Sequence, residues 1–281
     1  MTFDPAVVVC STISLRHLPL DQALERIAAE GFTAIDLGAL PGVCDHVPVP
    51  LDDAAVASVA DTVTRSGLRV VSVNADVGDL NRPLTEPEAE ERRAHVERLV
   101  ALCIAVGATA LVLPNGRQDH APFVSDAADT ALVAAELERI RAVVEASGLR
   151  LWVEAPHLLR FHDSIQASAP LIEQLDDRIG LVCDTSHIVA SGGTVEEFAE
   201  RFGPHIAHVH IRDAEPGYIH HSVGNGTVDF AAALAALARN GYQGVFSLEL
   251  ETRDVENEHR ARAAREAAEY ISDLHSSKGT A

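Results

Sequence analysis

Four residues that can bind a metal ion stand where short apolar segments of the chain end. They are Glu154, Asp184, His210 and Glu249, after Leu-Trp-Val, Leu-Val-Cys, His-Val and Ser-Leu respectively. Apolar runs of this length, bounded by glycine, suit strands that are buried on both faces in a parallel sheet. The carboxyl ends of parallel strands lie on one side, where α/β enzymes place their chemistry. We therefore expect these four side chains to converge.

Three carboxylates in one pocket repel one another and raise one another's pKa unless a cation lies among them. A single glutamate at a strand end is more often a rim charge or a partner of a helix end, but four such strand ends together favour a metal site. Three carboxylates and one imidazole form a hard, oxygen-rich set. The expected cofactor is a divalent metal, Mn²⁺ before Mg²⁺, Co²⁺ or Zn²⁺.

The rest of the chain alternates between predicted strands and predicted helices. Strands are expected at residues 7–11, 34–37, 69–74, 110–113, 150–154, 179–183, 206–211 and 244–250. Helices are expected from Leu18 to near Gly31, at 52–66, 86–106, 125–147, 169–175, 195–202 and 230–240, and from Val255 onward. Eight such units without a change in composition predict a single-domain α/β protein over residues 1–281, a (β/α)8 TIM barrel with a frayed tail at 276–281. An open doubly wound sheet is the alternative, but no glycine-rich turn follows the first strand.

Composition narrows the class of function. The formal net charge of −20 argues against nucleic-acid binding, which needs a basic surface to neutralise phosphates. The four cysteines lie far apart without a C-x-x-C pair, which indicates reduced thiols in a cytoplasmic protein. We expect no signal peptide and no membrane segment. No run of basic residues marks a phosphate site, and Lys278 is the only lysine.

Several motifs resemble the xylose-isomerase-like TIM-barrel superfamily, which includes sugar-phosphate isomerases and epimerases, ketose 3-epimerases and endonuclease-IV-type enzymes. The segments are Val153-Glu-Ala-Pro-His157, Cys183-Asp-Thr-Ser-His187, His208-Val-His-Ile-Arg-Asp213, Gly224-Asn-Gly-Thr-Val-Asp-Phe230 and Gly241-Tyr-Gln-Gly-Val-Phe-Ser-Leu-Glu249. The resemblance implies the same four metal ligands. It also implies a small carbohydrate substrate and a possible homo-oligomer.

Six further residues are candidates for substrate binding. His46 lies in the loop after the second predicted strand, and His157 follows Glu154 by three residues, where it could also orient a ligand. The resemblance makes His187 a substrate contact or a second-metal ligand. It makes Arg212, ahead of the Ala214-Glu-Pro-Gly loop, a contact for distal hydroxyls. The remaining two candidates are Asn74, at the end of the third strand, and His220.

The leading hypothesis is a metal-dependent sugar isomerase or epimerase acting on a small ketose or keto-polyol. The metal would polarise the substrate carbonyl, one of Glu154 and Glu249 would remove the adjacent proton, and the other would return a proton. Proton return to the same carbon gives epimerisation, and return to its neighbour gives isomerisation. A dehydratase or lyase could start from the same enediolate.

Two further alternatives have different requirements. A non-catalytic sugar-binding barrel would need no metal. An endonuclease-IV-like nuclease would need more metal ligands than the chain offers, because Asn74 and Pro114-Asn115 stand where such enzymes carry histidines.

Overall fold

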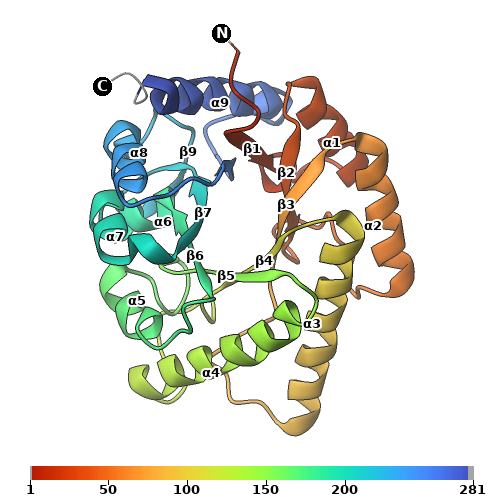
Figure 1. The fold of residues 1–281 in the computed structure, drawn as a ribbon, viewed down its shortest axis with the longest axis vertical. Coiled ribbons are helices and arrows are strands. Elements are labelled where there is room, and N and C mark those ends of the chain that lie inside the picture. The colour runs from red at the N-terminus through yellow and green to blue at the C-terminus, as the bar shows by residue number, and fades with distance from the viewer. Residues whose placement is uncertain (1, 278–281) are drawn as a thin grey trace.

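Eight parallel strands form a closed barrel in the computed structural model, which describes residues 2–277 (Figure 1). The order around the barrel is β1-β10-β7-β6-β5-β4-β3-β2. The strands are β1 (Val8–Ser11), β2 (Ala34–Ala39), β3 (Arg69–Ala75), β4 (Ala110–Pro114), β5 (Arg150–Glu154), β6 (Gly180–Asp184), β7 (Ile206–Ile211) and β10 (Phe246–Leu248). The predicted TIM-barrel fold is confirmed.

Helices cover the outside of the barrel (Figure 1). They are α1 (Leu20–Ala29), α2 (Asp53–Ser66), α3 (Glu86–Val106), α4 (Asp126–Glu145), α5 (Ile165–Ile172), α6 (Thr185–Ala190), α7 (Val195–Phe202), α8 (Phe230–Arg239) and α9 (Arg260–Ser276). Side chains at the helix starts accept backbone N–H groups that have no partner inside the helix, as Asp52 does for α2 and Ser125 for α4. Gly67 and Gly107 end α2 and α3 in the left-handed conformation that glycine adopts without strain.

Two apolar clusters stabilise the barrel. The larger one lies between the strands and the surrounding helices, and the smaller one contains Val9, Ala34, Val71, Ala110, Val112, Trp152 and Val182. Trp152 stacks on the buried His208 ring at a centroid distance of 5.0 Å, so His208 belongs to the inner packing of the barrel. The strands thus hold their carboxyl ends on a closely packed support.

Several predicted boundaries were wrong by a few residues. The helix predicted at 169–175 is α5, which begins at Ile165 because Ser164 caps it by accepting the N–H of Ala167. The strand predicted at 244–250 is limited to β10, since Leu250 N donates to Ser14 Oγ instead of continuing the ladder. The helix predicted from Val255 begins at Arg260, after the 3-10 turn η3 (Asn257–His259).

An antiparallel hairpin follows β7, where the sequence indicated a loop. It consists of β8 (Asp213–Glu215) and β9 (Tyr218–His221). Gly217, with φ of +81°, allows the tight turn between them. The buried Asp213 carboxylate accepts the backbone N–H groups of Ala214, Gly224, Gly226 and Val228, which holds the next loop against the hairpin. A Cβ at Gly226 would lie 2.3 Å from Asp213 Oδ1, which explains the glycine.

Part of the predicted frayed tail lies in α9, which includes Ser276, and residues 278–281 lie outside the described residues. Within residues 2–277, no helix is both long and apolar enough to cross a membrane.

Gly180, the first residue of β6, should not tolerate a side chain. A Cβ there would lie 2.4 Å from Ala207 Cβ and 2.6 Å from the Trp152 ring. We expect Gly180→Ala to lower the free energy of unfolding by about 1–3 kcal/mol, because overpacked cores must shift side chains or backbone. Urea denaturation measures the change, and a midpoint equal to that of the wild type would contradict this packing.

Candidate active site

The four residues expected to bind metal lie together at the carboxyl ends of the barrel strands. Glu154 ends β5, Asp184 ends β6, His210 lies in β7 and Glu249 follows β10. All four side chains are buried. Each contributes one ligand atom to a group in which all such atoms lie within 4.8 Å of one another. His210 Nδ1 is 3.5 Å from Glu154 Oε1 and 3.3 Å from Glu249 Oε2.

Three of these side chains are held through an atom that does not face the centre of the cluster. Asp184 Oδ1 accepts the backbone N–H groups of Ser186 and His187, because Asp184 also caps α6. Glu249 Oε1 accepts from Asn74 Nδ2 at 3.0 Å. His210 Nε2 lies 3.2 Å from Asp36 Oδ2. Such outer contacts orient metal ligands and leave the remaining lone pairs free.

The free atoms fit a hard divalent cation. Glu154 Oε1, Asp184 Oδ2 and His210 Nδ1 are buried without a hydrogen-bond partner among the described residues. Buried polar atoms are rarely left without a partner unless a water or an ion completes the site. Three carboxylate oxygens and one imidazole nitrogen match the donors that Mn²⁺, Mg²⁺, Co²⁺ or Zn²⁺ accept.

Burial and mutual repulsion shift the protonation of the cluster. Burial, with Glu249 and Asp184 nearby, raises the pKa of Glu154 from its ordinary 4.5 to about 7. Burial also raises the pKa of Glu249. Burial would raise the pKa of Asp184 as well, but Arg212 and His210 lower it below its ordinary value. Burial would lower the pKa of His210, but Glu249, Asp36 and Glu154 raise it well above 6.5. A raised pKa on both glutamates favours a proton on one of them, as acid–base chemistry requires.

A cavity of about 250 Å³ opens above the cluster. Five of the predicted substrate-binding residues line it: Asn74, His157, His187, Arg212 and His220. The sixth, His46, is not among the lining residues. Its Nε2 lies 3.0 Å from the Leu18 carbonyl oxygen and its Nδ1 lies 3.2 Å from Cys44 Sγ. Both ring nitrogens of His46 therefore have partners, one in its own loop and one in the segment before α1.

The stacked rings of His157 and His187 lie beside Glu154, with their centroids 3.7 Å apart. Burial lowers the pKa of both rings well below 6.5, so both are neutral near pH 7. Leu158 N donates to His187 Nδ1, and His187 Nε2 lies 3.2 Å from Arg212 Nη2. Leu158 N and Arg212 Nη2 are both donors and a neutral imidazole has one acceptor nitrogen, so only one of these two contacts is a hydrogen bond. Leu159 N donates to His157 Nδ1, so the proton of neutral His157 is on Nε2.

The cavity is also lined by residues that the sequence did not indicate, namely Arg16, Asp76, Arg160 and Arg253, and by Glu251 at the rim. Arg160 Nη1 donates to the Gly116 carbonyl and Nη2 to Asp76, so this side chain connects the loops after β3, β4 and β5. Arg16 Nη1 donates to Glu251 Oε2 at 3.0 Å across the mouth. No local motif marks Arg16, Asp76 and Arg160, because the partner of each is distant in sequence.

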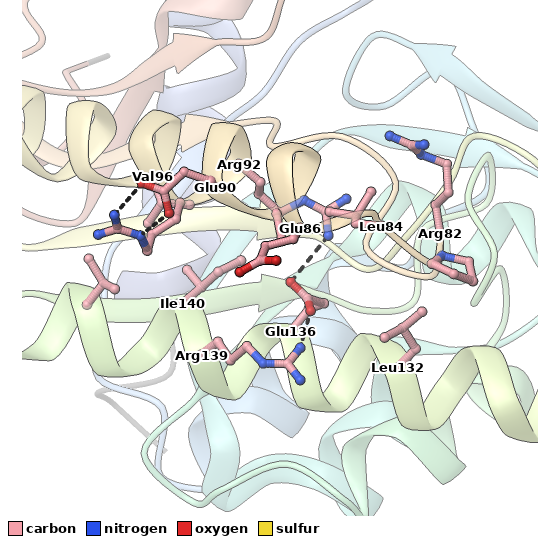
Figure 2. Close-up of a pocket in the computed structure, with 14 residues that line it drawn as sticks. Arg82, Leu84, Glu86, Glu90, Arg92, Val96, Leu132, Glu136, Arg139 and Ile140 are labelled. Atoms are coloured by element: carbon pink, nitrogen blue, oxygen red, sulfur yellow. Dashed lines mark hydrogen bonds and ion pairs between the residues drawn. The ribbon is translucent and has the colours of Figure 1, made fainter.

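A larger cavity, of about 570 Å³, lies outside the barrel between α3 and α4 (Figure 2). Its charged side chains pair with one another, since Glu136 interacts with Arg92 and Arg139, and Arg93 with Glu90. None of the candidate ligands or substrate-binding residues lines it. The cavity above the barrel strands is therefore the better candidate for an active site.

The chain belongs to the xylose isomerase-like TIM barrel family, whose model matches residues 24–274. The resemblance inferred from the motifs is thus confirmed. An inosose isomerase of Bacillus velezensis is 24% identical over 270 residues, which cover 92% of this chain and 94% of the relative.

Solved structures of similar proteins show the same fold. The IolI protein with a bound zinc atom has a TM-score of 0.78 at 19% identity, covering 96% of this chain and 98% of its own. A D-tagatose 3-epimerase-like protein has a TM-score of 0.77 at 17% identity, covering 98% and 100%. The 3-keto-D-glucoside 4-epimerase YcjR of E. coli has a TM-score of 0.73 at 17% identity, covering 94% and 98%.

The raised pKa of Glu154 predicts that the unfolding free energy of the metal-free protein decreases as the pH rises. A carboxyl with a folded-state pKa of about 7 contributes stability below its ordinary 4.5, and this contribution is lost as pH rises through 7. In the Glu154→Gln variant, residue 154 does not titrate, so it contributes no such decrease in the unfolding free energy. Between these pH values, the unfolding free energy of the chelator-treated wild type should fall relative to the variant by up to about 1.4 kcal/mol per pH unit. Parallel pH curves from urea titrations would contradict the prediction.

Proposed function

We propose that the protein is a divalent-metal-dependent sugar isomerase or epimerase that acts on a small ketose or keto-polyol. The observation that carries the proposal is the buried group of Glu154, Asp184, His210 and Glu249 below a cavity. The names of the relatives support it, since they include an inosose isomerase and two proteins of the sugar-epimerase type.

Glu154, Asp184, His210 and Glu249 would hold the metal. The bound cation would polarise the substrate carbonyl and make the adjacent C–H more acidic. We favour Mn²⁺ because three of the four donors are carboxylates, although the IolI relative was solved with zinc.

The two glutamates would transfer the proton. Glu154 comes from β5 and Glu249 from the end of β10, and in the barrel order β6 and β7 separate these strands. Their carboxylates therefore approach the cavity from different directions. One carboxylate removes the proton next to the carbonyl to form an enediolate, and the protonated partner returns a proton to this carbon or its neighbour. Both pKa values are raised toward the pH at which an acid and a base can exchange roles.

Other residues of the cavity would orient the substrate. Neutral His157 carries a proton on Nε2, 3.9 Å from Glu154 Oε2, and can donate it to a substrate oxygen. Arg212 Nη1 is buried without a hydrogen-bond partner among the described residues and can donate to a hydroxyl. His187, Asn74 and His220 would contact the substrate or the side chains that hold it.

Proton exchange tests the proposed chemistry. The Mn²⁺-loaded protein, mixed in D₂O with inosose, ketoses and 3-keto-glucosides, should exchange one hydrogen next to the carbonyl, which NMR detects. The products then separate epimerisation, isomerisation and loss of water. A metal-loaded protein that exchanges no hydrogen on any of these compounds would contradict the proposal.

Glu154→Gln and Glu249→Gln should each reduce this exchange by about 10²–10⁴-fold, because each removes one member of the acid–base pair. Both variants should remain folded, since glutamine has a similar shape. Glu215→Gln, at the exposed end of β8 and outside the cavity, is the control and should exchange at the wild-type rate. Near-normal exchange by either active-site variant, with metal content verified, would exclude that glutamate from proton transfer.

Asp36 should support metal binding without touching the metal. Its Oδ2 faces His210 Nε2, and its Oδ1 accepts from Ser72 Oγ at 3.1 Å, so Asp36 keeps Nδ1 of His210 directed at the cluster. Asp36→Asn should weaken Mn²⁺ or Zn²⁺ affinity by about 10–100-fold, as loss of such outer contacts does in other metal sites. Calorimetric titration measures this, and Ser72→Ala should have a smaller effect. Unchanged affinity in Asp36→Asn would contradict the role.

A further inference from the structure

Arginines from four separate segments line the active-site cavity. Arg16 follows η1 (Thr12–Leu15), Arg160 lies in the loop after β5, Arg212 follows β7 and Arg253 lies after β10. Arginine suits the recognition of carboxylates and phosphates, because its planar guanidinium offers several donors in a fixed geometry. This collection is notable in a chain whose net charge is −20.

Two of these arginines are buried and retain unused donors. Arg160 and Arg212 are 5% and 1% exposed. Arg160 Nε and Arg212 Nη1 have no hydrogen-bond partner among the described residues. A buried donor without a partner costs free energy that a ligand can recover. These nitrogens can therefore serve an acceptor-rich group of the substrate.

The arginines exceed the carboxylates available to them at the mouth. Asp76 pairs with Arg160, and Glu251 serves both Arg16 and Arg212, at 3.0 and 3.9 Å. Arg212 has one further carboxylate partner, Asp184 of the proposed metal cluster, at 3.6 Å. The exposed Arg253 forms no ion pair with any residue between 2 and 277, and its backbone N–H donates to the His220 carbonyl at the edge of the cavity. The deeper carboxylates belong to the proposed metal cluster.

The total charge of the loaded cavity is positive. When one of Glu154 and Glu249 is protonated, as the proposed proton transfer requires, the four arginines and a divalent cation would supply six positive charges. Only four negative charges would oppose them, from Asp76, Asp184, Glu251 and the other glutamate. The site therefore lacks negative charge.

We infer that the substrate of this site carries an anionic group, a carboxylate or a phosphate, and that Arg253 binds this group at the rim. The inference rests on the proposed function, because it takes the carbonyl end of the substrate to lie at the metal cluster. The anion lies at the other end of the carbon chain, within reach of Arg253 and Arg16. It supplies the missing charge and distinguishes the substrate from a neutral sugar.

Binding of substrate-like compounds that cannot react tests the inference separately from catalysis. The probes are D-glucitol, D-gluconate and D-glucitol 6-phosphate, which are neutral, carboxylated and phosphorylated chains of similar length without a ketone or aldehyde. Calorimetry with the Mn²⁺-loaded protein should show that at least one anionic probe binds about ten- to a hundredfold more tightly than glucitol, as expected for a charge-assisted hydrogen bond. The tighter of the two identifies the anion.

Arg253→Gln should reduce this preference to within about threefold, because the charged partner is lost. Arg69→Gln is the matched control, since Arg69 is an exposed arginine at the start of β3, the opposite end of the barrel. It changes the net charge equally and should leave the preference intact. Both arginines are exposed, so neither variant should lower the melting temperature.

Three results would overturn the inference. They are equal binding of glucitol and both anions, no binding of any probe, and an anion preference that survives in Arg253→Gln. The last result would mean that the anion binds the metal or another arginine. Hydrogen exchange on neutral ketoses together with equal binding of all probes would refute the anionic substrate and leave the proposed isomerase intact. A preference for an anionic probe that depends on Arg253, without hydrogen exchange on any substrate, would support the anion site and refute the proposed isomerase.

Discussion

Three carboxylates buried within a few ångströms of one another are the constraint on which the active-site end of the barrel depends. Glu154, Asp184 and Glu249 have ligand atoms within 4.8 Å, and all three side chains are buried. Their repulsion is tolerable only if positive charge lies among them. In the metal-free chain this charge comes from His210, whose pKa is raised well above 6.5 by the surrounding acids despite its burial. A divalent cation held by Glu154, Asp184, His210 and Glu249 would supply more charge, and His210 would then be a neutral ligand.

The support for this cluster explains why the barrel must be closed. Asn74 on β3 holds Glu249 beyond β10, and Asp36 on β2 holds His210 on β7, so both contacts cross the interior between strands that are not neighbours. Asn115 adds a further contact by donating to the Glu154 carbonyl from the segment after β4. An open sheet would separate these partners. The geometry of the ligands is therefore a property of the whole barrel.

The sequence was most informative where the signal was local. Glu154 and Asp184 end apolar runs, and a strand end directs its side chain to the mouth whatever the distant parts of the chain do. His46 was predicted from its place in a loop, where no such rule applies, and its partners Cys44 Sγ and the Leu18 carbonyl depend on how the loop folds. Local sequence reasoning also could not show Asp36 as the partner of His210, since the two are joined only by closure of the barrel. Arg160 and Asp76 are separated by 84 residues, and no spacing rule connects them.

These differences separate the part of the site that determines the reaction from the part that determines the substrate. The residues proposed as acid–base pair and metal ligands stand on or directly after strands, so packing of the barrel holds them in place and the sequence pattern indicates them. Arg16, Arg160 and Arg253 stand in loops, which tolerate changes in length and composition without loss of the core. The proposed metal cluster would therefore serve neutral or anionic substrates, depending on how many loop arginines remain without a carboxylate partner. In this chain, Arg253 has no such partner among the described residues, which is consistent with the inferred anionic substrate.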